Sequence, residues 1–153
     1  MGVDVRPADR ALVAAAVSAW EISDYARALV GAAGMPQSVE TRIQAARQLR
    51  VLTLELLDRT VLAEVLGGAS WEEVAAALGL TPETTQSRYE ETARVWARPE
   101  AATWTAPGEA GDRDVEGTAA ALDAWYARHR DGVDLLDEEA SDPVSRILRQ
   151  NGH

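Results

Sequence analysis

At 153 residues the chain is about one domain long, and it can bury a core without a metal or a disulfide to hold it. It contains no cysteine, which excludes disulfides, thiol catalysis and cysteine-ligated zinc. The net charge of −10 weighs against a simple nucleic-acid binder, because affinity for phosphates comes from cationic side chains. The acidity is concentrated late in the chain, however. Residues 99–153 carry five arginines and twelve acids, whereas residues 41–98 carry seven arginines and eight acids.

The composition favours an all-α protein. Alanine is abundant and is the best helix former, and runs of β-branched residues are few. The first helical segment, residues 8–33, is rich in alanine but carries five charged side chains, so it is neither a signal peptide nor a membrane span. Together with the absence of cysteine, this predicts a cytoplasmic protein that makes no contact with a membrane.

Two long helices are predicted at the amino-terminal end, and the first begins at Pro7 and ends at Gly31, Gly34 and Pro36. Its core-facing stripe recurs at steps of three and four residues and consists of Leu12, Ala15, Ala19, Ile22, Ala26 and Leu29. A second stripe predicts that this helix is covered on more than one side, and it consists of Val13, Val17 and Trp20.

Ser38 is the predicted N-cap of the second helix. Two alternatives stay open for its length: the helix runs on to Leu66 and stops at Gly67 and Gly68, or it breaks near Asp58, because an unbroken run is long for a globular helix. Its apolar stripe consists of Ile43, Ala46, Leu49, Leu52 and Leu56.

Three interpretations of the two long helices stay open at this point. They can bury their stripes against each other in an antiparallel hairpin, or against a second copy in a homodimer, and the pattern does not choose between these. The third interpretation is a pocket for a small molecule between the helices, with Trp20 and Tyr25 among its lining residues.

Residues 68–98 contain the most specific local pattern in the chain. Ser70 followed three positions later by Glu73 forms a capping box at the start of a helix. Gly79 supplies the positive backbone φ that a sharp turn needs, and Thr81 and Pro82 begin a second helix. The inward-facing residues are Val74, Ala75, Leu78, Leu80 in the corner, Thr85, Tyr89, Thr92 or Ala93, and Trp96. This pattern predicts a helix-turn-helix, the geometry that presents its second helix to a DNA major groove.

The remainder of the chain divides into a linker and a C-terminal part. Residues 99–113 are predicted to be a linker because of their proline and glycine content. A helix over residues 115–130 follows, with an apolar face of Val115, Ala119, Leu122, Trp125 or Tyr126, and His129. The acidic residues 131–142 then lead to a short helix with Val144, Ile147 and Leu148. We therefore expect a helical domain over residues 1–98 and a C-terminal part, residues 114–153, that packs on the same body.

A series of residues in the helix-turn-helix follows a family pattern: Trp71, Glu72, Glu73, Val74, Ala75, Leu78, Gly79, Leu80, Thr81, Pro82, Thr84, Ser87, Arg88 and Tyr89. The stretch resembles region 4 of extracytoplasmic-function-type bacterial sigma factors and the short helix-turn-helix of many small actinobacterial regulators. Residues 59–66 resemble the supporting helix that precedes the motif in those families.

The second helix of the motif departs from the family pattern. Gln86 stands where the families place a basic residue and Thr85 where they place an aliphatic one, while Glu90 and Glu91 replace an arginine-rich stretch. These changes weaken the expected contacts with DNA phosphates. Nothing elsewhere in the chain resembles the sigma-factor region that melts promoters, so we do not expect a sigma factor.

The resemblance implies a sequence-specific transcriptional regulator that binds double-stranded DNA with the second helix of the motif in the major groove. Glutamine can pair with adenine, serine can contact several bases, and glutamate can accept from cytosine. The side chains expected to read bases are Glu83, Thr84, Gln86, Ser87 and Glu90. Those expected to contact phosphates are Trp71, Thr81, Arg88 and Arg94.

The alternative is a protein-binding adaptor, with a sigma-region-4-like fold that engages transcription machinery or another regulator without reading DNA. The acidic residues 131–142 are a second expected site for a protein partner, or a segment that competes with DNA for the motif. No nucleophile–base constellation and no histidine–carboxylate spacing typical of a metal site occurs, so we expect neither enzymatic activity nor a metal or cofactor.

Overall fold

The structure, a computed structural model, describes residues 5–98, 114–129 and 142–150, and every regular element in these ranges is an α-helix. The helices are α1 (Pro7–Ala32), α2 (Val39–Leu66), α3 (Trp71–Leu78), α4 (Pro82–Trp96), α5 (Val115–His129) and α6 (Ser145–Gln150). The expected all-α class is therefore confirmed for this part of the chain. The predicted linker, residues 99–113, and the acidic residues 131–141 lie outside the described residues.

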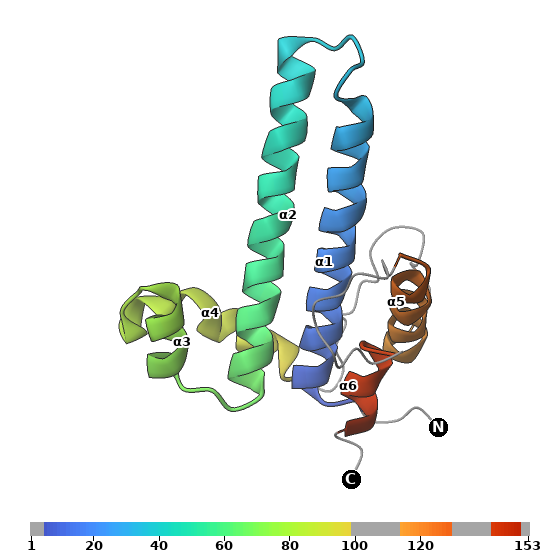
Figure 1. Ribbon diagram of the computed structural model, residues 1–153. Coiled ribbons are helices and arrows are strands. Elements are labelled where there is room, and N and C mark those ends of the chain that lie inside the picture. Colours follow the sequence, from blue (N-terminus) through green and yellow to red (C-terminus); the bar gives the residue numbers. More distant parts are fainter. Residues whose placement is uncertain (1–4, 99–113, 130–141, 151–153) are drawn as a thin grey trace.

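Helices α1 and α2 form a long antiparallel hairpin that carries the other helices at its base (Figure 1). The hydroxyl of Ser38 accepts a hydrogen bond from the Thr41 N–H at 3.1 Å, which confirms Ser38 as the N-cap of α2. Of the two alternatives for the length of this helix, the unbroken one is observed: α2 continues through Asp58 to Leu66. Packing along the whole length of α1 supports a helix longer than average.

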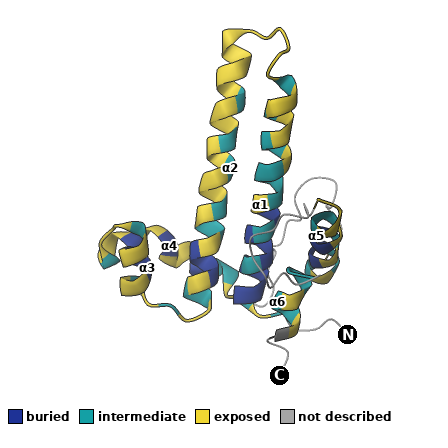
Figure 2. Ribbon diagram, in the orientation of Figure 1, coloured by how far each residue is buried: buried dark blue, intermediate teal, exposed yellow. Residues whose placement is uncertain are grey.

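The buried core lies at the base of the hairpin, where α1 is covered from several sides (Figure 2). Helix α2 lies along one side of α1, and α5 and α6 also pack against α1. The second predicted stripe is confirmed at Val13 and Val17, which are fully buried together with Ser18. The first predicted stripe is wrong at Ala19, which is exposed, because α2 lies beside Ser18, whose hydroxyl accepts from Arg59 Nη1, and Ala19 lies further round the helix.

Arg10 joins the C-terminal end of α4 to the first turns of α1. Its side chain is buried, and its Nη2 donates to the carbonyl oxygens of Trp96 at 3.1 Å and Arg98 at 3.3 Å. Its Nη1 donates to the carbonyl oxygen of Val5 at 2.8 Å. The last carbonyls of a helix have no partner within the helix and carry partial negative charge, so a buried guanidinium stabilises them. This contact holds the C-terminal end of α4 against the first turns of α1.

A buried carboxylate links α5 to α6. The Asp123 oxygens accept hydrogen bonds from the backbone N–H groups of Val144 at 2.7 Å and Ser145 at 3.0 Å, so a side chain of one helix caps the start of the next. His129 stacks on Trp125, which lies one turn earlier on the same predicted face of α5, with ring centroids 4.9 Å apart, and it is exposed.

Replacing Arg10 with alanine is expected to lower the free energy of unfolding by about 2–4 kcal/mol, because three carbonyl oxygens lose a charged donor and the buried side chain leaves a cavity. Urea unfolding followed by circular dichroism measures this loss. The control is Arg27→Ala, an exposed position on the same helix, where we expect a change within about 0.5 kcal/mol. Equal losses in the two variants would contradict a stabilising role for the Arg10 contacts.

Candidate nucleic-acid interface

Helices α3 and α4 (residues 71–96, the α3–α4 unit) are joined by a tight turn. The capping box is present at the start of α3: the Ser70 N–H donates to Glu73 Oε2 at 2.8 Å, and the Glu73 N–H donates to Ser70 Oγ at 3.2 Å. Gly79 ends α3 with a φ of 68°, in the left-handed region that favours glycine. The N–H of Leu80 then returns to the carbonyl oxygen of Ala75 at 3.0 Å, which closes the turn.

The start of α4 is also capped as the sequence predicts. Thr81 Oγ1 accepts a hydrogen bond from the Thr84 N–H at 3.2 Å, and Pro82 occupies the first turn. Thr85 is fully buried, and its hydroxyl donates to the Thr81 carbonyl oxygen at 2.9 Å. The hydroxyl of Thr85 is therefore satisfied within its own helix.

Tyr89 anchors α4 to the hairpin. Its ring is buried in a cluster with Val61 of α2 and Val74 of α3, and its hydroxyl donates to Asp58 Oδ1 at 2.9 Å. Burial and the bond to the nearby carboxylate both raise the pKa of Tyr89, so the hydroxyl stays protonated at neutral pH. The sequence predicted that Tyr89 faces inward. It did not predict Asp58 as the acceptor of the Tyr89 hydroxyl, since 31 residues separate the pair.

The five predicted base-reading residues all lie on the exposed surface of α4: Glu83, Thr84, Gln86, Ser87 and Glu90. They occupy its first nine residues and leave the opposite face, with Thr85 and Tyr89, to pack on the rest of the protein. Two of them are engaged locally. The Thr84 hydroxyl accepts from Thr81 Oγ1 at 3.0 Å, and Gln86 Nε2 donates to Glu90 Oε1 at 3.3 Å. Both are exposed contacts that a base edge can replace.

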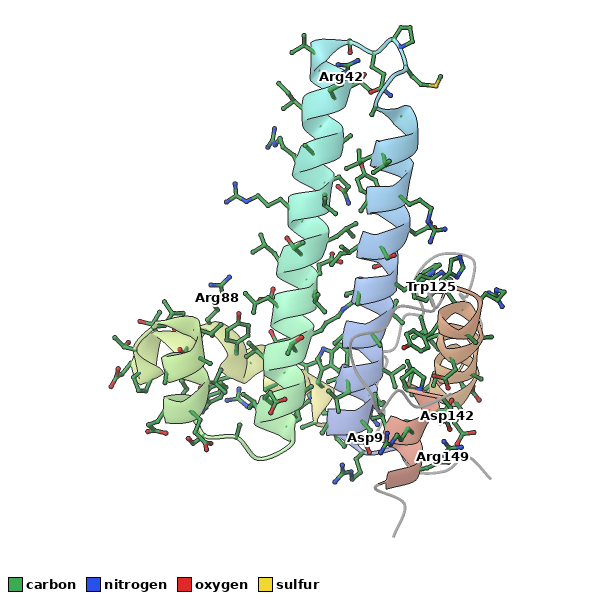
Figure 3. The ribbon with its side chains drawn as sticks, in the orientation of Figure 1. Asp9, Arg42, Arg88, Trp125, Asp142 and Arg149 are labelled. Carbon is green, nitrogen blue, oxygen red and sulfur yellow. The ribbon has the colours of Figure 1, made fainter. Side chains whose placement is uncertain are left out.

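The predicted phosphate-binding residues do not share one environment, unlike the predicted base-reading residues. Arg88 lies at the surface beside the hairpin (Figure 3), with its guanidinium carbon 5.5 Å from the centre of the Tyr89 ring. Thr81 caps α4, as described above. Trp71 is partly buried and packs against the Val61, Val74 and Tyr89 cluster. Its contact with that cluster gives it a role in packing.

Arg94 is the predicted phosphate ligand with acidic neighbours. Its Nη1 lies 2.5 Å from Glu91 Oε2, and its Nη2 lies 3.8 Å from Glu90 Oε1. The α3–α4 unit as a whole contains five glutamates and two arginines, a formal charge of −3. Such exposed pairs are individually weak. Together, however, they lower the positive potential that a phosphate backbone would meet.

The structure corrects one detail of the predicted turn and decides one detail of α4. Leu80 does not fill the corner of the turn, because it is 39% exposed. The tight return of its backbone N–H to Ala75 satisfies the turn without its side chain. The choice left open between Thr92 and Ala93 is decided for Ala93, which is buried while Thr92 is exposed.

A separate pocket of about 360 Å³ lies between α1 and α2 near the tip of the hairpin. Tyr25 lines it, as the ligand-pocket interpretation expected, whereas Trp20 is not among its lining residues. Arg42 also lines it and donates from Nη2 to the Met35 carbonyl oxygen at 3.1 Å. The pocket is wide open and several of its lining side chains are exposed. It therefore lacks the enclosure of a typical small-molecule site.

Comparisons of the chain with protein-family models, with curated proteins and with solved structures gave no match. None of the described helices is both long enough and apolar enough to span a membrane. Within the described ranges, no cluster of three or more histidine, aspartate or glutamate side chains is arranged to hold a metal ion.

The capping box predicts a pH dependence. The hydrogen bond from the Ser70 N–H lowers the pKa of Glu73 below its ordinary value of 4.5. The ionised Glu73 carboxylate therefore stabilises the folded state above its ordinary pKa of 4.5. This stabilisation is lost as the pH falls through the lower pKa that Glu73 has in the folded state. Glu73→Gln keeps an acceptor but does not titrate. We expect the wild type to melt above this variant near about pH 6, and the difference to shrink as the pH falls below 4.5 through the lowered pKa of Glu73. A constant difference in thermal unfolding across this range would contradict the assignment.

Proposed function

We propose that this protein is a sequence-specific DNA-binding transcriptional regulator that places α4 in the major groove. The proposal is supported by the way α3 and α4 meet, with a capping box, a left-handed glycine and a threonine cap within twelve residues, Ser70 to Thr81. Two short helices joined in this manner form the usual support for a recognition helix. The resemblance to sigma region 4 and to small actinobacterial regulators points to the same function.

The observation that carries the proposal is the contrast between the two faces of α4. The buried face is held rigidly by Tyr89 and Thr85, and the exposed face presents polar side chains from the first turn onward. Gln86 can bond adenine through two atoms, and Glu83 can accept from the amino group of cytosine. Base reading needs such a fixed helix, because a displacement of about 1 Å breaks a bidentate contact.

Phosphate contacts come from the flanks of the same helix. The N-terminus of α4 carries a partial positive charge beside Thr81, which favours a nearby phosphate. Arg88 is exposed and directly follows Gln86 and Ser87, so it projects from a different side of α4 and can reach the DNA backbone while those side chains reach bases.

The second candidate function, a protein-binding adaptor, is favoured by the charge of the α3–α4 unit. Glu90 and Glu91 engage Arg94, and three further glutamates lie on the two helices, so the surface is more acidic than a DNA-binding face normally is. A basic patch on another protein fits such a surface better than a phosphate backbone does.

Selection of random duplex DNA on the purified full chain tests the first function. We expect an enriched DNA motif, and we expect its enrichment to fade in Gln86→Ala. Arg88→Ala should instead lower the affinity for all duplexes similarly and reduce the slope of log affinity against log salt concentration by about one. The matched control is Arg128→Ala, an exposed arginine on α5, which leaves both unchanged. If no DNA motif is enriched even at low salt, sequence-specific DNA binding is rejected and the protein-binding adaptor is the function that stands.

A double variant, Glu90→Gln with Glu91→Gln, separates the two functions further. If α4 lies on DNA, removing both carboxylates releases Arg94 for a phosphate and steepens the salt slope by about one, with tighter binding at low salt. Fluorescence anisotropy of a labelled duplex measures both. The control pair is Glu40→Gln with Glu64→Gln, exposed acids of α2 outside the α3–α4 unit. Equal affinities for the two double variants would contradict a DNA-facing α4.

A further inference from the structure

The outer face of α2 is an apolar surface with no partner in the described part of the chain. Several large apolar side chains along it are exposed, among them Val39 (75%), Ile43 (55%), Leu54 (46%) and Leu57 (41%). Figure 2 shows this face exposed along most of the hairpin. The next residue of the same face, Val61, is buried beneath the α3–α4 unit. The exposed apolar surface therefore ends before Val61 and extends from there towards the tip of the hairpin.

The positions along this face are symmetric about Arg50. Ile43, Ala46, Arg50, Leu54 and Leu57 (the outer stripe) follow one another at steps of three, four, four and three residues. Steps of three and four keep side chains on one face of a helix and are the spacing of helix–helix seams. Because the series reads the same in both directions, an antiparallel second copy sets its Leu57 level with Ile43 and its Leu54 level with Ala46.

The charges along α2 favour the same direction of pairing. Residues 39–50 carry three arginines and one acid, whereas residues 51–66 carry three acids and one arginine. That one arginine, Arg59, is turned inward, with its Nη1 2.6 Å from Ser18 Oγ. Parallel copies would set like charges beside each other. Antiparallel copies set each basic half beside an acidic half and bring Arg47 within two residues of Glu55 of the second copy.

We propose that two copies of this chain associate through the outer stripes of α2, antiparallel, about a two-fold axis at Arg50. The contact is isologous, since the same surface is used twice and the charge pattern complements itself. The aliphatic stem of Arg50 lies in the seam while its guanidinium reaches past it to solvent. Val39 of each copy comes level with Val61 of the other, so the tip of one hairpin abuts the α3–α4 unit of its partner.

This dimer does not depend on the proposed function, but it has a consequence that does. The two copies of Val61, where the α3–α4 units attach, are separated by 22 helical positions along the pair, about 33 Å at about 1.5 Å per residue. Half-sites one turn apart on DNA are separated by about 34 Å. An antiparallel dimer therefore matches the spacing of a two-fold symmetric operator.

Sedimentation velocity of the full chain without DNA tests the dimer independently of DNA binding. We expect a concentration-dependent dimer whose dissociation constant rises at least roughly tenfold in Leu54→Glu, because a carboxylate is placed in the apolar seam. The matched control is Val30→Glu, where an exposed valine of α1 lies off the stripe. A wild type that is monomeric at all concentrations, or a dimer that Leu54→Glu leaves intact, would overturn the proposal.

Cysteine cross-linking tests the direction of pairing, because the natural chain has no cysteine. We expect an oxidised mixture of Ile43→Cys and Leu57→Cys chains to form a mixed disulfide, and each variant alone to remain uncross-linked. Circular dichroism of each variant checks that the helices are retained. Efficient self-cross-linking of Ile43→Cys alone would show a parallel pair and contradict the two-fold axis at Arg50.

Discussion

The bond between the Arg10 guanidinium and the last carbonyls of α4 is the constraint on which the arrangement of the base depends. It crosses the chain from residue 10 to residues 96 and 98, and it satisfies groups that a helix end otherwise leaves to water. The Nε of Arg10 is buried without an acceptor in the described residues, so the contact also carries a desolvation cost. With Tyr89 bonded to Asp58, α4 is held at both its middle and its end.

The hairpin separates the molecule into a packed base and an open tip. At the base α1 contacts several helices and buries residues around its circumference, while towards the tip α2 is the one described helix that covers it. The proposed role of α4 in reading DNA requires the rigid base, since base contacts tolerate little displacement. The uncovered apolar face of α2 is a surface of the kind that marks association. The two halves of the molecule are therefore suited to different tasks, one to positioning α4 and the other to meeting a partner.

Electrostatics is the main physical conflict in the proposed function. A chain of net charge −10 repels a phosphate backbone at long range. In addition, Glu90 and Glu91 form ion pairs with Arg94 near the end of α4. Binding must then come mainly from short-range contacts at the first turns of α4, which favours sequence-specific over non-specific association. The same surface suits a basic protein, so the choice between DNA and a protein partner depends on charge more than on shape.

The sequence by itself determined the local structure. Ser38, the Ser70–Glu73 pair, Gly79 and Thr81 begin or end helices where predicted, because caps and turns join groups only a few residues apart. Only the tertiary structure decided that α2 is unbroken at Asp58, that Leu80 and Ala19 are exposed, and that Arg10 is buried. Burial depends on what other segments cover a residue, and periodicity within one helix carries no information about those segments.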